Sequence, residues 1–155
     1  MGEIIKLSRS TVEKYLSCPR CCVLDKKYQI SPPSLPFTLN IAVDNLCKNE
    51  FDHYRRLQEP HPLFIENGID AVPFQHKDLE RWRSNFQGIR YKSNEYNFDF
   101  GGAVDDIWQK KNGDLIVVDV KATSRNNFDW SETFDKYEYA KAYKRQLEMY
   151  QWLFK

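Results

Sequence analysis

Three carboxylates and an amine lie on either side of a single turn, in the stretch GGAVDDIWQKKNGDLIVVDVKAT (101–123). Asp105 and Asp106 precede an Asn-Gly turn, and Asp119 and Lys121 follow it within a run of valines. Side chains two residues apart on a strand share a face, so Asp119 and Lys121 point the same way and the neighbouring valines point into a core. Burying such charges is costly unless they pair or bind a cation. The stretch therefore predicts either a structural salt bridge or a cation site.

The length of the turn decides which aspartate faces Asp119. If the loop has three residues, 111–113, and its glycine takes a positive φ angle, Asp105 lies opposite Asp119. If the loop has only two residues, 112–113, the register slips by one and Asp106 lies there instead. In either case two carboxylates come within about 5 Å of each other across the hairpin. Each of them resists ionisation unless a cation lies between them.

Oxygen ligands on a rigid hairpin suit Mg²⁺ or Mn²⁺. Such an ion can polarise a phosphoryl oxygen and lower the pKa of a bound water. Lys121, on the same strand face as Asp119, can orient that water or balance transition-state charge. Gly101 and Gly102 lack side chains where a nucleic acid backbone would have to approach. The local chemistry therefore favours phosphodiester hydrolysis.

The elements that must position this hairpin follow from hydrophobic periodicity and from end and turn signals. The stretch 115–123 is nearly continuous in apolar character, which predicts a central strand. Helices, then a meander of strands, then a helix indicate an α/β or α+β fold with a small sheet. The apolar stripe of the long helix comprises Leu39, Val43, Leu46, Cys47 and Phe51. The predicted elements are a short helix in 7–20 capped by Ser8 or Ser10, a proline-rich connection over 30–36, a long amphipathic helix over 38–57, a short strand in the loop 61–74, a short helix over 76–86, strands over 88–93, 96–109 and 115–123, a polar connection over 124–136, and a helix over 137–155.

Composition sets the remaining bounds. With 155 residues the chain is long enough for one domain with a sizeable core. Its 23 basic and 22 acidic residues nearly cancel, so a polyanion must be held by local patches. Basic residues outnumber acidic ones in 1–30 and in 136–155, although for either patch alone a solvated face is the favoured interpretation. The chain has no apolar run of membrane-spanning length and no signal peptide, so we expect a cytoplasmic protein without a membrane partner.

Three short motifs occur in a fixed order along the chain. Gly102–Asp105, Asp119–Lys121 and Gln146–Tyr150 match the pattern GxxD…DxK…QxxxY. In this the chain resembles the PD-(D/E)XK nuclease superfamily, and within it the RecB-like nucleases, including the CRISPR-associated RecB-like exonucleases. Leu16–Arg20 is also similar to the "CPR" segment that many of them carry after the first helix. The resemblance covers residues 8 to 150.

The resemblance implies a restriction-endonuclease-like α/β core, a small mixed sheet flanked by helices, as a single nuclease-like domain over 1–155. The family core continues past the QxxxY helix into a further strand, so the C-terminal end looks shortened here. The resemblance makes Asp105, Asp119 and Lys121 catalytic. It implies metal ligation by Asp105, Asp119 and the carbonyl of Val120, and it favours the three-residue loop.

Further roles follow from the resemblance on two helices. Many RecB-like members place a metal-binding His in the long helix where this chain has Asp44, which could itself bind the metal. Gln146 and Tyr150 would contact nucleic acid or brace the site, the alternative being a helix packing seam. Lys144 and Arg145 flank them and could bind phosphates. Glu50, on the same helix as Asp44, is a weaker candidate for a metal ligand. The histidines that match no role in the family, and that we expect on the surface or in packing contacts, are His53, His61 and His76.

The cysteines are Cys18, Cys21, Cys22 and Cys47. Several RecB-like nucleases bind an iron–sulfur cluster with one N-terminal and three C-terminal cysteines, and no cysteine follows Cys47 here, so no such cluster is expected. Cys18 and Cys21 form half of a zinc site, but neither remaining cysteine has standard spacing. Buried reduced thiols are favoured over zinc.

The expected function is divalent-metal-dependent cleavage of DNA, at single- or double-stranded ends, with Mg²⁺ or Mn²⁺ as cofactor. Exonuclease action is favoured over sequence-specific cutting because no segment resembles a major-groove reader. The resemblance further implies protein partners in DNA repair or defence. One alternative is a nuclease-like DNA-binding or complex-assembly module with weak or no catalysis. Another is a small zinc-binding interaction protein using the CPRCC segment.

Overall fold

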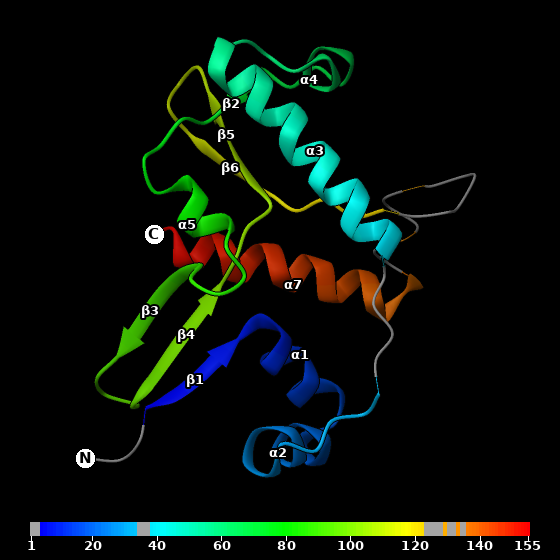
Figure 1. Cartoon of the computed structure of the whole chain (residues 1–155), viewed down its shortest axis with the longest axis vertical. Coiled ribbons are helices and arrows are strands. Elements are labelled where there is room, and N and C mark those ends of the chain that lie inside the picture. The colour runs from blue at the N-terminus through cyan, green and yellow to red at the C-terminus, as the bar shows by residue number, and fades with distance from the viewer. Residues whose placement is uncertain (1–3, 34–37, 123–128, 130–132, 134–135) are drawn as a thin grey trace. The chain divides into compact units, whose positions relative to one another are not determined.

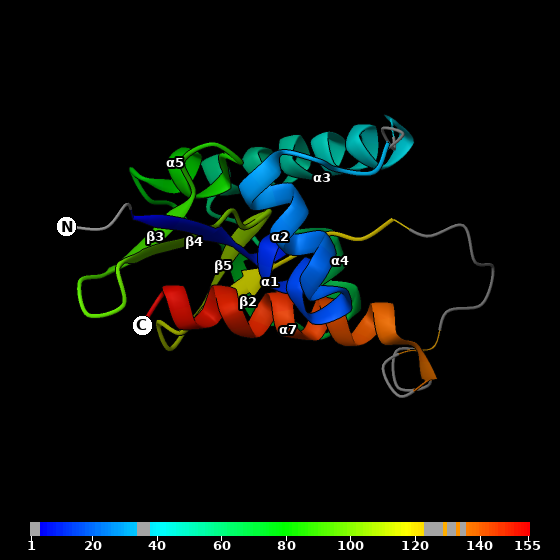
Figure 2. The same cartoon turned by 90° about the horizontal axis from the view of Figure 1, so that it is seen from below.

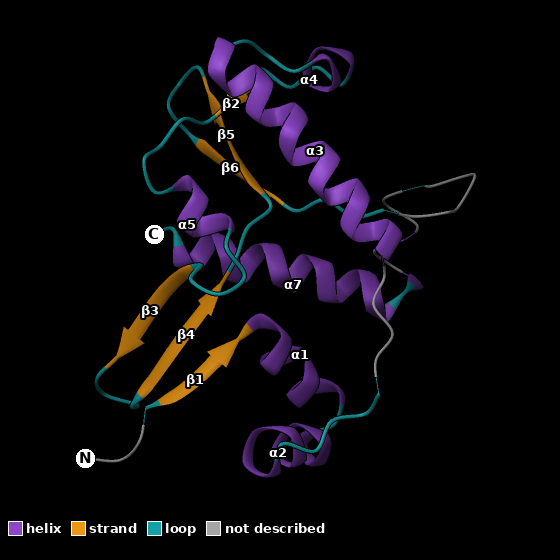
Figure 3. Cartoon of the chain, viewed as in Figure 1, coloured by secondary structure: helices purple, strands orange, loops and turns teal. Residues whose placement is uncertain are grey.

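The computed structural model describes residues 4–33, 38–122, 129, 133 and 136–155 (Figure 1). The chain is a mixed α/β protein in which helices accompany small sheets (Figure 3). It divides into two compact units built from interleaved segments. Unit 1 comprises Met1–Pro36, Ile89–Gly102 and Trp130–Lys155, and unit 2 comprises Phe37–Gly88 and Ala103–Asp129. Within the described ranges, no helix is long and apolar enough to cross a membrane.

Unit 1 contains a three-stranded mixed sheet with the strand order β1-β4-β3. β1 (Ile5–Ser8) pairs in parallel with β4 (Phe98–Gly102), which pairs antiparallel with β3 (Ile89–Ser93). Helix α7 (Glu138–Leu153) packs against β3 and against α1 (Arg9–Ser17), seen from a second direction in Figure 2. The predicted C-terminal helix is therefore confirmed, whereas the strand before α1 was not predicted.

The N-terminal helical region consists of two helices rather than one. α1 begins after Ser8, whose hydroxyl accepts a hydrogen bond from the backbone N–H of Thr11, so Ser8 and not Ser10 is the cap. α2 (Pro19–Tyr28) begins directly after Cys18, which has extended backbone angles. Proline suits the first position of a helix because that position needs no N–H donor. Pro19 therefore ends one helix and begins the next.

Unit 2 contains an antiparallel sheet with the strand order β2-β5-β6. The strands are β2 (Ala71–Pro73), β5 (Asp106–Lys110) and β6 (Leu115–Val118). The helices are α3 (Thr38–Leu57), α4 (Pro62–Glu66) and α5 (Leu79–Arg83). α3 has the bounds that its amphipathic pattern predicts.

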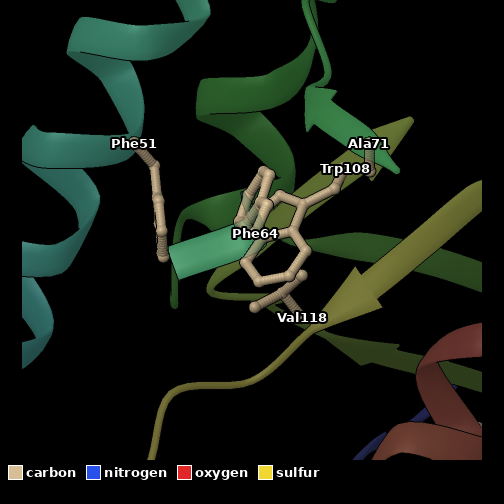
Figure 4. Close-up of a cluster of buried hydrophobic side chains, with 5 residues drawn as sticks. All are labelled: Phe51, Phe64, Ala71, Trp108 and Val118. Atoms are coloured by element: carbon tan, nitrogen blue, oxygen red, sulfur yellow. The ribbon is translucent and has the colours of Figure 1, made fainter. Parts of the chain in front are cut away.

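The core of unit 2 lies between the sheet and its helices. Apolar burial of this kind contributes roughly 25 cal/mol per Å² removed from water. Ile116 and Val120, each two residues from Val118, pack partly buried against the same cluster, as the hairpin pattern predicts. The buried cluster, drawn in Figure 4, comprises Phe51, Phe64, Ala71, Trp108 and Val118.

Three predictions about these elements are wrong. The strand predicted over 96–109 is two strands, β4 and β5, in different sheets. Between them, the backbone N–H of Val104 donates a hydrogen bond to the carbonyl of Trp82 at 3.1 Å instead of continuing the β4 ladder. The strand predicted to be central, β6, lies at an edge of the described sheet. The stripe of α3 is only partly buried: Leu39 is 74% exposed and Leu46 is 67% exposed.

Candidate active site

The β5–β6 hairpin has the three-residue loop. The ladder pairs Gln109 with Leu115 and Asp106 with Val118. The backbone N–H of Lys110 donates to the carbonyl of Asp114 at 2.9 Å, which closes the loop over 111–113. Gly113 has a φ of 91°, a conformation that glycine adopts without steric cost. The local turn chemistry thus sets the register that extends to Asp105 opposite Asp119.

Asp105 lies one residue beyond the last ladder pair and is held against the end of β6. Its backbone N–H donates to the carbonyl of Val118 at 3.2 Å. Its carboxylate Oδ2 accepts a hydrogen bond from the backbone N–H of Val120 at 2.7 Å. Main chain and side chain together therefore fix Asp105 beside the Asp119–Lys121 segment.

Asp119 and Lys121 form a salt bridge, which is one of the two alternatives predicted from the sequence. The Asp119 side chain is 4% exposed and that of Lys121 is 30% exposed. Lys121 Nζ also lies 3.5 Å from the carbonyl oxygen of Val120. The amine therefore sits between a buried carboxylate and a backbone oxygen, and its partial exposure leaves it accessible from solvent.

Asp44 on α3 is linked to Asp105 by Lys48, a residue that the sequence analysis missed. Lys48 Nζ lies 2.7 Å from Oδ2 of Asp44 and 3.6 Å from Oδ1 of Asp105. Its side chain is 19% exposed, so this ammonium is largely removed from water. The i,i+4 spacing of Asp44 and Lys48 was a readable signal for their pairing. The contact of Lys48 with Asp105 depends on packing α3 against the hairpin.

The electrostatics of Asp105 indicate a crowded acidic site. Burial raises the pKa of Asp105 above its usual value, and the charges of Asp119 and Asp44 raise it further. The Val120 N–H and the Lys48 ammonium oppose this rise. Carboxylates placed close together favour a cation between them.

Carboxylate and carbonyl oxygens of this kind are the ligands that a divalent cation prefers. Oδ1 of Asp44 is buried without a hydrogen-bond partner, although an ionised carboxylate seeks donors or a cation for both oxygens. Among the described residues, no group of three or more His, Cys, Asp and Glu side chains is arranged to hold a metal. A set made of Asp105, Asp119 and the Val120 carbonyl has only two such side chains. Lys48 contacts both Asp44 and Asp105 of that set.

Asp106, the other aspartate of the pair, belongs to a different network. Its side chain is completely buried and bonds to Arg55 of α3, which also bonds to Asp52. Arg55 Nε donates to the carbonyl of Phe74 at 2.7 Å, and Asp52 is shared with Arg83. Burial raises the pKa of Asp106 despite the opposing effect of Arg55. The two adjacent aspartates thus have opposite surroundings: Asp105, just before β5, faces the candidate site, and Asp106 faces the interior of unit 2.

The QxxxY residues lie in unit 1, on α7. Gln146 and Tyr150 are both buried, with Gln146 Nε2 donating to the Tyr150 hydroxyl at 3.2 Å and Arg9 donating to Gln146 Oε1. Their burial favours the packing alternative over direct contact with nucleic acid. A Cβ atom on Gly102 would lie 2.3 Å from Tyr150 Cε1. The space beside Gly102 is therefore filled by a tyrosine ring, and the prediction that it admits a nucleic acid strand is wrong.

The other basic candidates on α7 differ in their surroundings. Arg145 forms a bidentate pair with Glu13 of α1, at 2.9 and 2.8 Å, and this contact lowers the pKa of Glu13. Such a pair holds the guanidinium away from a phosphate. Lys144 is exposed. Lys144 is therefore the better placed of the two for a phosphate contact.

The histidines and Glu50 stay outside the cluster around Asp105. His61 is buried, caps α4 through Nδ1 and contacts the ring of Phe51 at 5.1 Å between centroids. Glu50 lies 3.2 Å from His61 Nε2. His76 stacks on Trp82 and His53 contacts Tyr54 edge-on. These contacts give His61 and His76 packing roles within unit 2.

The four cysteines have different surroundings, and the expectation of buried thiols is only partly correct. Cys22 is buried, Cys18 and Cys47 are half-buried, and Cys21 is exposed. Cys47 packs against the core of unit 2, whereas the other three lie on unit 1. Zinc binding through CPRCC would have to use cysteines of unit 1 with other ligands.

No protein-family model, curated protein or solved structure matches the chain.

Proposed function

We propose that the protein is a divalent-metal-dependent DNA nuclease of RecB-like type that acts on ends. The observation that supports this most directly is the register of the β5–β6 hairpin. It brings Asp105 to the segment that carries Asp119 and Lys121, through the hydrogen bond between Asp105 and the Val120 N–H. Asp105, Asp119 and Lys121 are thereby gathered at the end of one hairpin, although the two aspartates are 14 positions apart in the sequence.

Asp105, Asp119 and the Val120 carbonyl would hold Mg²⁺ or Mn²⁺. When bound, the ion supplies Lewis-acid polarisation of a phosphoryl oxygen and a more acidic bound water. Asp105 is oriented for this by the Val120 N–H, which occupies Oδ2 and leaves Oδ1 toward Lys48. Asp119 is nearly excluded from water, so its charge acts in a medium of low dielectric.

Lys121 would act on the substrate rather than on the fold. Its ammonium can orient the attacking water or stabilise the extra negative charge of the transition state. For this it must exchange part of its contact with Asp119 for a phosphate oxygen. An ion pair with a side chain that is 30% exposed is open to that exchange, unlike the fully enclosed pair of Arg55 and Asp106.

Substrate binding would rest on phosphate contacts. Such contacts give affinity without sequence readout, which suits an enzyme acting at DNA ends. Lys144 on α7 is the exposed candidate for such a contact. This assignment keeps DNA as the proposed partner and assigns no base-reading residue.

End-labelled single- and double-stranded DNA, incubated with Mg²⁺, Mn²⁺ or EDTA, tests the proposal. We expect metal-dependent shortening of the labelled strand, reduced at least about 10²-fold in Lys121→Ala because an electrostatic stabiliser of the transition state is lost. Lys111→Ala is the matched control, since this lysine lies on the loop of the same hairpin and its side chain is 83% exposed. Retained cutting by purified Lys121→Ala, or equal loss in Lys111→Ala, refutes the assignment of the site.

A binding or assembly module without catalysis is the second candidate, and Lys48 is the observation that favours it. An ammonium between Asp44 and Asp105 balances negative charge that a nuclease would use to bind its ion. Calorimetric titration of the wild-type chain with Mn²⁺ separates the two candidates. Binding that is lost in Asp119→Ala supports the nuclease, and no binding by folded wild type supports the module.

A further inference from the structure

The first turn of α2 brings two cysteine side chains together. Cys18 is the N-cap of the helix, and its sulfur accepts a hydrogen bond from the backbone N–H of Cys21 at 3.4 Å. The two side chains are close enough for each to shift the pKa of the other. Cys18 is half-buried and Cys21 is exposed, so a solvent-borne reagent can reach the pair.

The geometry of the pair suits an intramolecular disulfide. Residues three apart in a helical turn have Cα atoms about 5–6 Å apart, which is within the range that a disulfide spans. Pro19 stands at the first helical position between them and restricts the backbone there. A bond between the sulfurs therefore needs rotation of side chains and little movement of the chain.

The pKa values of the two thiols shift in opposite directions, which gives the two cysteines different roles. Hydrogen bonds from the Cys21 side chain and from its backbone N–H lower the pKa of Cys18, and the charge of Arg20 acts in the same direction. The same contact raises the pKa of Cys21. Thiolates are the nucleophiles of disulfide exchange, and a thiolate at a helix N-terminus is stabilised by the N–H groups there.

The other two cysteines lack this arrangement. The Cys22 thiol is buried and points to the carbonyl oxygen of Thr11 at 3.7 Å. Cys47 is half-buried against the core of unit 2, and burial raises its pKa. The chain therefore contains built-in controls of the same residue type.

We propose that Cys18 and Cys21 form a thiol–disulfide exchange site that reacts with low-molecular-mass disulfides. The Cys18 thiolate attacks one sulfur of the disulfide RSSR, forming a mixed disulfide and releasing RS⁻. The Cys21 thiol then loses its proton and attacks the Cys18 sulfur, closing the Cys18–Cys21 bond and releasing the second RS⁻. RSSR is reduced by two electrons to two thiols, and the two cysteines are oxidised by the same two electrons. This inference does not depend on the proposed nuclease activity.

Reaction of the full-length chain with oxidised glutathione under anaerobic conditions, in the presence of a metal chelator, tests the proposal. We expect wild type to lose two hydrogen atoms in its intact mass, and peptide mapping to locate the new bond between Cys18 and Cys21. Cys21→Ser should stop at one added glutathione on Cys18. Cys18→Ser should react at least about tenfold more slowly, because the stabilised thiolate is absent. Cys22→Ser and Cys47→Ser should behave as wild type.

Peptide mapping of wild type keeps the test decisive even if a variant fails to fold. Glutathione found first on Cys22 or Cys47, or an unchanged rate in folded Cys18→Ser, overturns the proposal. So does a zinc or iron content that must be removed before the pair reacts, since Cys18 and Cys21 would then be metal ligands. A Cys18–Cys21 bond that forms in the apo chain and is reversed by reduced glutathione supports it.

Discussion

Arg55→Met is expected to destabilise unit 2 strongly by leaving Asp106 charged and enclosed. The Asp106 side chain is completely buried, and its Oδ2 has no hydrogen-bond partner in the described part of the chain. The partners of Oδ1 are the Arg55 guanidinium and the Ile107 N–H, so the substitution removes the only cation among them. Breaking such a buried pair on one side costs about 3–5 kcal/mol. The free energy of unfolding of a whole domain is about 5–15 kcal/mol, so the loss is large.

The pH dependence of this loss distinguishes a buried charge from a simple packing defect. Burial already raises the pKa of Asp106 in the wild type, so the folded state binds this proton more tightly than the unfolded state does. Stability contributed by such a group is present below the unfolded aspartate pKa of about 4 and falls as pH rises above it. Removing Arg55 raises the pKa of Asp106 further. The destabilisation in Arg55→Met should therefore be greatest at pH 7 and shrink toward pH 4.

Urea denaturation followed by circular dichroism, at pH 7 and at pH 5, measures these differences. Asp106→Asn removes the charge, so Arg55→Met combined with Asp106→Asn should recover part of the stability lost in Arg55→Met alone. Arg81→Met is the matched control, because Arg81 pairs with Asp78 at 3.6 Å and its side chain is 54% exposed. That substitution should change stability by less than about 1 kcal/mol. Equal losses in Arg55→Met and Arg81→Met, or a loss independent of pH, refute the reasoning.

Three further outcomes follow from the structure. Lys48→Met should raise Mn²⁺ affinity about tenfold in calorimetry, because it removes the ammonium beside Asp105, whereas Lys48→Arg should not. Unchanged affinity in both variants contradicts competition between the Lys48 ammonium and the metal ion. Asp105→Asn should raise the urea midpoint at pH 7 in EDTA, because burial and neighbouring carboxylates raise the pKa of Asp105; a lowered midpoint contradicts this. Gly102→Ala should cost about 1–3 kcal/mol, because its Cβ would meet the Tyr150 ring, and Tyr150→Leu should relieve part of that cost; additive losses contradict the clash.

Local rules reached the hairpin because the relevant interactions are close in sequence. The Asn-Gly turn located the hairpin but allowed two loop lengths, and the structure, with Gly113 at positive φ, fixes the three-residue loop and its register. α3 was predicted with its observed bounds because its apolar residues recur at helical spacing. The capping choice between Ser8 and Ser10 stayed open, since either hydroxyl could reach an N–H of the first turn. The structure decides it through the hydrogen bond from Thr11 to Ser8.

Local sequence rules did not predict the pairing of strands that are far apart in the sequence. The parallel pairing of β1 with β4 joins segments about ninety positions apart, and a four-residue strand has too little pattern to be recognised alone. The separation of β4 from β5 depends on Val104 bonding to Trp82, which no local pattern indicates. Burial is set by what packs against each face, so the exposed Leu39 and Leu46 could not be told from the buried Phe51.

The sequence by itself determined the hairpin and the placement of one aspartate of the pair opposite Asp119, because a tight turn and a two-residue period leave only two registers. The strand predicted over 115–123 ends at Val118, so Asp119 and Lys121 lie in the segment directly after β6. Only the tertiary structure decided which basic residue each of the adjacent aspartates, Asp105 and Asp106, contacts. Asp105 meets Lys48 of α3 and Asp106 meets Arg55, about two turns further along the same helix. Those cations are far away in sequence, and only the packing of α3 against the hairpin places one beside each carboxylate.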